Sequence, residues 1–338
     1  MSAALQILAA ATLLALALGP LGGCSCGFDC SGGGNQNPTQ LSLGFSDESL
    51  EQLKQVVIEV DSISFRRTGA EDVVVERFTI PALGLVDADT FQVDLLEYQG
   101  LNQLLVIQDL ELEARTYNQL AIGILGGDIN RSYVQESSDQ LKVLSVSSGE
   151  LVLGGPSLAS GQQQFTVAFS LPQALLFEAS SDSYRLTTNG IRLADNASAA
   201  SLTGRVDSTL FNTVAPCDTK SDPESGNRLY LYSGRSLSAD KLADVYTSNS
   251  SSEIPAAAIA PFAVGALAQD TLTGGWQYAF GFIPAGEYSL AFACDAADDD
   301  PVDYNGIAIP LPTDQLYNIS LSASQKAICD IGSGASCK

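Results

Sequence analysis

Short apolar runs that alternate with polar turns recur along the chain from Leu41 to about Leu210. Runs of this regular spacing are typical of strands in an antiparallel sandwich or barrel. The pattern therefore predicts an all-β fold for this part of the chain. The expected strands cover residues 55–66, 73–78, 91–96, 104–107, 117–124, 150–153, 165–169 and 184–193.

The first of these runs, Gln55–Arg66, changes its side-chain parity in the middle. Apolar residues that alternate up to Val60 lie on one face of an extended strand, and those from Ile63 onward lie on the other. A β-bulge near Asp61 and Ser62 would return both halves to one buried face, so we predict a bulge there.

One segment, Leu171–Ala179, has a pattern that favours a helix. Pro172 is tolerated in the first turn of a helix, and Leu175 and Leu176 would face a neighbouring sheet. We expect a short helix that serves as a lid or a connection.

A second β domain is expected after a boundary near Thr213–Asn227, where Pro, Ser and charged residues cluster. The length of 338 residues is also enough for about two domains. Pro284–Glu287 (PAGE) predicts a tight turn, because Pro presets φ and Gly accepts a positive φ, and the flanking strands should pair as a hairpin. The expected strands are residues 228–233, 259–267, 275–283, 288–293, 306–309 and 316–321.

The N-terminus carries the features of an export signal. Residues 5–19 form an uncharged apolar run that suits a signal peptide and is short for a membrane span. The sequence Leu21–Cys24 resembles the bacterial lipobox, so we expect Cys24 to become the lipidated first residue. Plain secretion with Cys24 in a disulfide is the alternative. Ser25 in the next position indicates the outer membrane of a diderm bacterium.

These features divide the chain into five parts. A polar, Gly- and Ser-rich stretch follows the signal and predicts a flexible tether. The expected parts are a signal peptide (1–23), a tether (24–40), an N-terminal β-sandwich (41–212), a C-terminal β-sandwich (213–323) and a Cys-containing tail (324–338).

Charge and composition exclude several classes of function. Asp and Glu number 39 against 16 Lys and Arg, and a net charge of −23 repels the phosphates of nucleic acids. The chain has no His, which removes Ser-His and Cys-His nucleophiles and His-based zinc sites. Since no catalytic fingerprint is present, we expect a non-enzymatic protein that requires no cofactor.

Seven cysteines occur, and six remain once the lipidated residue is set aside. An even number in an oxidising compartment predicts disulfides. Sequence context favours a bond between Cys217, which opens the second domain, and Cys294, which ends an expected strand. It also favours a bond between Cys329 and Cys337 in the tail. Cys26 and Cys30 would pair with each other, or one of them with a cysteine of the tail.

Five carboxylates lie within nine residues after Cys294. Oxygen ligands at this density suit Ca²⁺, although the spacing differs from that of an EF-hand. A solvated acidic loop is the alternative interpretation. The candidate ligands are Asp295, Asp298, Asp299, Asp300 and Asp303.

Four aromatic residues alternate along one expected strand, at Trp276, Tyr278, Phe280 and Phe282. Alternation places all four on one face of the strand. That face is either the sandwich core or a platform on which a sugar stacks. Trp276 and Tyr278 are the stacking candidates, because each carries a polar group.

Four motifs, DSISFRR at 61–67, DLELEARTY at 109–117, GELVLGG at 149–155 and RLADN at 192–196, follow one another in the first β domain. Their order and spacing resemble the family of bacterial lipoproteins called domain of unknown function 4382, over about residues 45–210. The family pattern has Gly where this chain has Arg115. The resemblance implies a lipoprotein with β-sandwich domains and supplies no catalytic residues. The second domain, with its FIPAGEYSLAF sequence, is similar to prealbumin-like or immunoglobulin-like modules.

Together these observations predict a lipid-anchored protein of the cell envelope that works as a surface binding or scaffolding module. Its expected partners are the membrane, through the anchor, and a glycan or another envelope protein. One alternative is a structural or adhesive lipoprotein stabilised by calcium, the only candidate cofactor. The other is an accessory glycan hydrolase, since carboxylate pairs can cleave glycosidic bonds.

Overall fold

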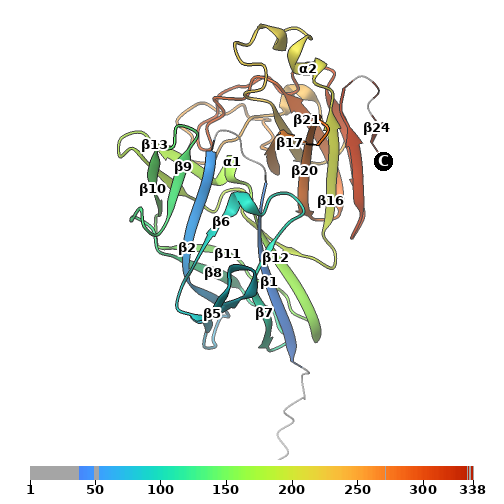
Figure 1. The fold of residues 1–338 in the computed structure, drawn as a ribbon. Helices are drawn as coiled ribbons and strands as arrows, with labels where there is room; N and C mark the ends of the chain where they lie inside the picture. Colours follow the sequence, from blue (N-terminus) through green and yellow to red (C-terminus); the bar gives the residue numbers. More distant parts are fainter. Residues whose placement is uncertain (1–37, 49–52, 271, 333, 335, 338) are drawn as a thin grey trace, which may run out of the picture. The chain divides into compact units, whose positions relative to one another are not determined.

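The computed structural model describes residues 38–48, 53–270, 272–332, 334 and 336–337, which form four main β-sheets and one two-stranded pair (Figure 1). The all-β prediction is therefore confirmed. We call the sheets of the N-terminal part A and B. Sheet A has the order β15 (Arg192–Asp195), β12 (Gly161–Phe169), β1 (Thr39–Asp47) and β7 (Leu104–Leu112).

Sheet B is the largest sheet and is built around the long strand β2. Its order is β11 (Glu150–Gly154), β8 (Gln119–Ile124), β2 (Leu53–Arg66), β9 (Tyr133–Glu136), β10 (Leu141–Val146), β14 (Ser183–Leu186) and β13 (Leu175–Glu178). Strands β3 (Val73–Val75) and β6 (Phe91–Asp94) also pair with β2, and β4 (Phe78–Ile80) and β5 (Leu85–Ala88) pair with each other.

Sheets A and B enclose the first hydrophobic core. Leu41, Leu43 and Phe45 alternate along β1 and point into it, and Phe45 packs edge-on against Phe169 of β12. Each fully buried side chain of this size contributes about 1.5–3 kcal/mol to folding. The predicted bulge in β2 is confirmed, since the register with β8 shifts at Asp61 and both halves of β2 face the core.

Sheets C and D form the second sandwich. Sheet C has the order β19 (Ala268–Gln269), β20 (Trp276–Ile283), β16 (Ala200–Val206), β23 (Lys326–Asp330) and β24 (Ser336–Cys337). Sheet D has the order β18 (Ala263–Ala266), β17 (Arg228–Ser233), β21 (Gly286–Ala293) and β22 (Leu316–Leu321). A second core lies between them.

Strand β17 is buried on both faces. Leu229 and Leu231 point into the second core, whereas Tyr230 and Tyr232 point into a third cluster beneath loops 239–260 and 296–311. Burial on both faces explains why residues 229–232 (LYLY) form a continuous apolar run.

Helices are few and short. The expected helix at 171–179 is only the single turn α1 (Leu171–Ala174), because the chain then continues as β13 and pairs with β14. Pairing with a neighbouring strand outweighs local helix preference in so short a segment. The remaining elements are α2 (Thr209–Asn212) and 3₁₀ turns at Pro81–Leu83, Leu95–Glu97, Cys217–Thr219 and Ala239–Lys241. Among the described residues no helix is long and apolar enough to cross a membrane.

The predicted hairpin around Pro284–Glu287 is wrong. Strand β20 belongs to sheet C and β21 to sheet D, so the turn carries the chain from one sheet to the other. The Tyr288 hydroxyl closes this turn by donating to the Pro284 carbonyl at 2.8 Å. A turn sequence fixes a local reversal, but it does not fix which strands pair.

The expected domain boundary and strand directions also differ from the structure. Ala200 and Leu202 already belong to the second core, so the chain leaves the first sandwich after Asp195 instead of near Thr213. Sheets A, B and C each contain a parallel pair, namely β1 with β12, β10 with β14 and β16 with β23. Strand β1 begins at Thr39, so the last two residues of the expected tether, 39 and 40, belong to this strand.

Arg192, which forms a buried ion pair within the first sandwich, also joins it to the second sandwich. Arg192 of β15 contacts Glu48 at 2.6 Å, and it donates to the carbonyls of Gly281 at 3.0 Å and Phe282 at 3.4 Å. Its guanidinium also lies 5.3 Å from the Phe262 ring. Burial raises the pKa of Glu48, and Arg192 acts in the opposite direction. These contacts hold the end of β1 against β20, where the candidate site lies.

Candidate functional site

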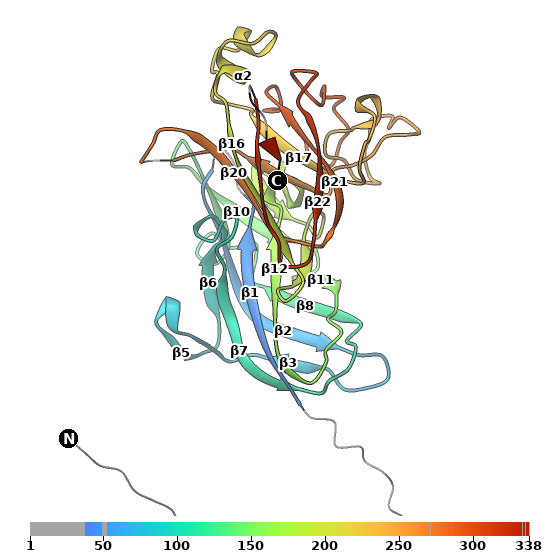
Figure 2. The same cartoon turned by 90° about the vertical axis from the view of Figure 1, so that its right-hand side faces the viewer.

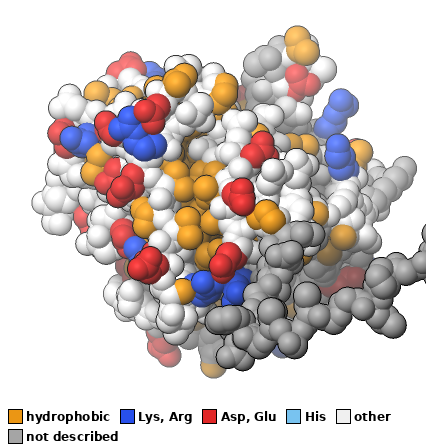
Figure 3. Space-filling model, turned by 90° about the horizontal axis from the view of Figure 1, so that it is seen from below, with side chains coloured by type: hydrophobic (Ala, Val, Ile, Leu, Met, Phe, Trp, Pro, Cys, Tyr) orange, Lys and Arg blue, Asp and Glu red, His pale blue; other side chains and the backbone are white. Residues whose placement is uncertain are grey.

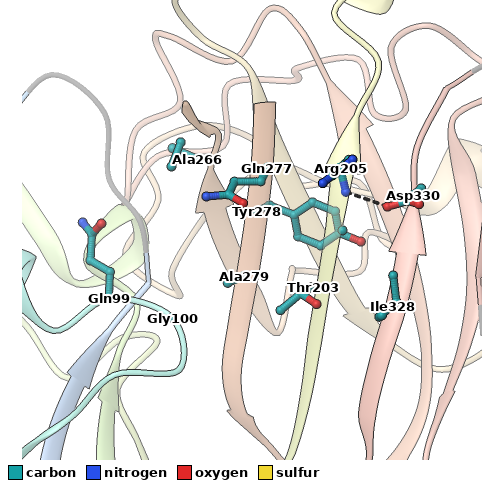
Figure 4. Close-up of a pocket in the computed structure, with 12 residues that line it drawn as sticks. Gln99, Gly100, Thr203, Arg205, Ala266, Gln277, Tyr278, Ala279, Ile328 and Asp330 are labelled. Carbon is teal, nitrogen blue, oxygen red and sulfur yellow. Dashed lines mark hydrogen bonds between the residues drawn. The ribbon is translucent and has the colours of Figure 1, made fainter. Parts of the chain in front are cut away.

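A groove of about 550 Å³ lies where the outer face of sheet C meets the loop after 3₁₀ turn Leu95–Glu97 (Figure 4). Thr203 and Arg205 come from β16, Gln277 and Ala279 from β20, and Ile328 from β23. These side chains point outward because their neighbours in each strand face the core, as strand alternation requires.

The register of sheet C arranges the groove in two rows. Ala279, Thr203 and Ile328 are paired across three strands and form a row of small and apolar groups. Gln277 is paired with Arg205, whose backbone N–H donates to the Asp330 carboxylate at 2.8 Å, and these residues form a polar row. A ligand would thus meet an apolar floor beside hydrogen-bonding groups.

Two glycines allow the wall of the groove to approach the sheet closely. A Cβ on Gly281 would lie 1.9 Å from the Gly100 carbonyl oxygen, and one on Gly100 would lie 2.8 Å from the Ala279 Cβ. Gly100 also has a φ of 65°, in the left-handed region that favours glycine. Gln99, next to it, lines the groove from the first sandwich. The groove therefore depends on contact between both sandwiches.

Arg205 is the distinctive charged group of the groove. Nine of the ten arginines form an ion pair within the described residues, whereas the Arg205 guanidinium has no hydrogen bond or ion pair there. Hydrogen bonds from Thr273 and the Leu272 backbone lower the pKa of the nearby Asp270, and Arg205 lowers it further. Its five donors are thus available to a ligand.

The stacking candidates from the sequence lie largely on the core side of the strand. Tyr278 is 3% exposed, and its hydroxyl donates to the Cys329 carbonyl at 2.7 Å, so its ring lines the groove only from beneath. Trp276 is half-buried and packs edge-on against Phe211. Neither ring forms an open platform like the one that the sequence suggested.

The expectation that all four aromatic residues share one face is wrong at Phe282. The register with β16 shifts between Phe280 and Ile283, and Phe282 has a φ of 54°. This irregularity places Ile283 in the core in place of Phe282.

The five aspartates of the acidic segment do not converge. Asp299 is buried, accepts a hydrogen bond from the Tyr230 hydroxyl at 2.6 Å, and has a pKa raised by burial to about 6. Asp300 accepts from the backbone of its own turn, and Asp303 from the Ser251 backbone. Asp295 and Asp298 are exposed. Among the described residues no group of three or more acidic or cysteine side chains is arranged to hold a metal ion.

The cysteines of the second sandwich pair as predicted. Cys217 is bonded to Cys294, and Cys329 is bonded to Cys337 across β23 and β24. Cys24, Cys26 and Cys30 lie outside the described residues.

Apolar surface is also exposed elsewhere. Seen from below, the described chain shows hydrophobic side chains gathered on one face, with acidic and basic side chains around them (Figure 3). On the first sandwich, Val86 is 80% exposed, and a hollow of about 300 Å³ is lined by Val106, Ile107 and Leu110. Sites for small ligands combine apolar walls with a few placed polar groups. The groove on sheet C combines both kinds of group, since Gln277, Arg205 and Asp330 lie beside Ala279 and Ile328.

The sequence pattern did not identify the other groove residues, because they come from segments far apart in the chain. Gln99 and Ile328 are separated by more than half of the sequence. The alternation in Ala200–Val206 is a signal that could have identified β16 and its outward residues.

The fold and groove define a two-sandwich β protein with a candidate binding site at the joint. Residues 38–188 match the model of the family described as "Domain of unknown function (DUF4382)", so this part of the chain belongs to that family. The match confirms the resemblance, and it ends between β14 and β15. A comparison with curated proteins found no match.

Solved structures show only distant similarity. A leucine-rich repeat protein from Bacteroides thetaiotaomicron is 11% identical with a TM-score of 0.20, covering 86% of this chain and 25% of its own. A candidate cell adhesion protein from Bacteroides fragilis is 9% identical with a TM-score of 0.20, covering 89% and 97%. The major pilin subunit of Bacillus cereus is 9% identical with a TM-score of 0.18, covering 85% and 62%. TM-scores at this level do not support a shared topology.

Proposed function

We propose that this protein is a non-catalytic binding module of the cell envelope, anchored by lipid on Cys24, and that it binds a glycan in the groove on sheet C. The observation that carries the proposal is the groove itself, in which Gln277 and Arg205 lie beside the row formed by Ala279, Thr203 and Ile328. The Arg205 guanidinium has no hydrogen bond or ion pair in the part of the chain that the structure describes. Amide, hydroxyl and guanidinium groups hydrogen-bond to sugar hydroxyls, and apolar groups pack against sugar C–H faces.

Binding without turnover is favoured by the chemistry of the lining. Hydrolysis of a glycosidic bond ordinarily uses two carboxyl groups flanking the bond. Asp330 is the one carboxylate among the residues that line this groove. We therefore propose recognition of the glycan without cleavage.

The anchor rests on the sequence alone. The uncharged apolar run at 5–19 followed by Leu21–Cys24 supports export and lipidation. Acyl chains on Cys24 would hold the protein at a membrane surface, since more than one chain gives stable attachment. Replacing Cys24 by Ser should move the protein from the membrane to the soluble fraction. Retention in the membrane fraction would contradict the proposed anchor.

Titration of the full chain with dextran, mannan and xylan tests the binding function. For whichever of these polysaccharides binds the wild type, Gln277→Ala should lower the affinity three- to tenfold, because one or two hydrogen bonds are lost. Gln140→Ala is the matched control, since Gln140 is exposed in a turn away from the groove. Release of reducing ends would show an enzyme, and unchanged binding by Gln277→Ala would move the site elsewhere.

A further inference from the structure

A second groove, of about 600 Å³, lies on the outer face of sheet A. Gln40 and Ser42 of β1, Gln162 and Gln164 of β12, and Asp109 of β7 line it. Its lining also includes Asp195 and Asn196, so the sequence motifs at 109–117 and 192–196 both contribute residues to it.

The strand register makes this groove an ordered array of polar side chains. Parallel pairing of β1 with β12 places Gln40 beside Gln162 and Ser42 beside Gln164. The Gln162 amide donates to the Gln40 carbonyl oxygen at 3.3 Å, and the Asp109 backbone donates to the Ser42 hydroxyl at 3.2 Å. The Gln164 amide has no hydrogen bond within the described residues, so its donors and acceptor face the groove unused.

The composition of the lining selects among ligands. The groove is lined by amides, hydroxyls, carboxylates and small residues, with no Lys, Arg or aromatic residue among them. Protein partners are usually anchored by Trp, Tyr or Arg, and anions by paired cations. A neutral ligand rich in hydroxyls fits best, because each hydroxyl both donates and accepts, as an amide does.

The two grooves are connected through β1. Figure 2 shows sheet A below sheet C on the side that faces the viewer. Strand β1 runs from Gln40 in the second groove to Asp47, whose carbonyl accepts the Gly100 N–H at 2.8 Å at the wall of the first groove. Seven residue-to-residue steps separate Gln40 from Asp47, and they span about 24 Å at the usual rise of a strand. Residues 43–47 of β1 are buried, and Gln103 covers the outward face of the strand at Gly44 and accepts a hydrogen bond from Thr166 at 2.7 Å. A single extended polymer would therefore reach both grooves by passing over Gln103.

We propose that the groove on sheet A is a second glycan-binding site, and that one uncharged polysaccharide chain occupies both grooves. This inference rests on the proposed function of the first groove. Two weak sites filled by one chain bind far more tightly than either site alone, because the second contact is intramolecular.

The test uses the full chain and size-fractionated oligomers of whichever of dextran, mannan or xylan binds, with polygalacturonate as the acidic comparison. Affinity should rise tenfold or more from short oligomers to oligomers that span both grooves. Gln164→Ala should remove this gain with length, and Gln140→Ala should keep it. Neutral polymers should bind more tightly than polygalacturonate.

Equal affinity at all lengths, or a full gain with length in Gln164→Ala, would overturn the second site. If Gln277→Ala then still weakened binding, the first groove and the proposed function would stand alone. If Gln164→Ala weakened binding while Gln277→Ala did not, the second site would stand and the first would fall. No binding to any of the polysaccharides would overturn both.

Discussion

Replacing Asp299 by Asn should remove part of the pH dependence of stability in the second sandwich. The Asp299 carboxylate is buried beneath the loops on sheet D. It accepts hydrogen bonds from the Tyr230 hydroxyl at 2.6 Å and the Val245 N–H at 3.1 Å, and it lies 3.4 Å from Arg228. An Asn can keep both hydrogen bonds if its amide donates to the Tyr230 oxygen.

The magnitude follows from the pKa of Asp299. Burial raises this pKa from 3.8 to about 6 in the folded protein, with Arg228 acting in the opposite direction. Between these values the folded state binds more protons than the unfolded state, so stability falls as the pH rises. The stabilisation is fully present below pH 3.8 and is lost as the pH passes 6. Integrated from pH 4.5 to 7, the loss is about 2 kcal/mol.

Trp276 is the only tryptophan of the chain and packs against the second core, so its fluorescence follows unfolding of this sandwich. Urea titrations at pH 4.5 and 7 should show that wild type loses about 2 kcal/mol more than Asp299→Asn over this interval. Burial also raises the pKa of Asp244, so the difference between the proteins is the informative quantity. Asp295→Asn, exposed in the same loop, is the control and should behave as wild type. Identical changes in wild type and Asp299→Asn would refute the reasoning.

Two further predictions concern the disulfide and the joint. Replacing both Cys217 and Cys294 by Ser should lower the free energy of unfolding of the second sandwich by about 4 kcal/mol, since the bond closes a separation of 77 residues; an unchanged urea midpoint would contradict this. Gly281→Ala should cost about 2 kcal/mol, because its Cβ would lie 1.9 Å from the Gly100 oxygen. Gly154→Ala, where a Cβ meets open space, is its control in thermal unfolding, and equal melting temperatures would show that the joint tolerates the side chain.

Local patterns in the sequence predicted several features correctly. The parity change in β2 required a bulge, and the structure has one at Asp61. The pairing of Cys217 with Cys294 followed from their positions at the start of the domain and the end of a strand. Both inferences depend on residues whose constraints act along one strand or between a few covalent partners.

Other expectations failed where distant segments compete. The PAGE turn suggested a hairpin, yet β20 pairs with β16 and β19, while β21 pairs with β17 and β22. Residues 175–178 favoured a helix locally but pair with β14. In each case the free energy gained by pairing and burial exceeds the small local preference.

The sequence by itself determined that this chain forms β-sandwiches, where most strands lie, and which cysteines of the second sandwich pair, because these depend on short-range alternation and on residue chemistry. Only the tertiary structure decided which strands became neighbours and therefore where the grooves lie. Gly100, Thr203, Gln277 and Ile328 meet in one groove although the chain separates them widely. The physical reason is that strand pairing and burial are non-local: a strand's alternation shows that one face will be covered, but not which segment will cover it.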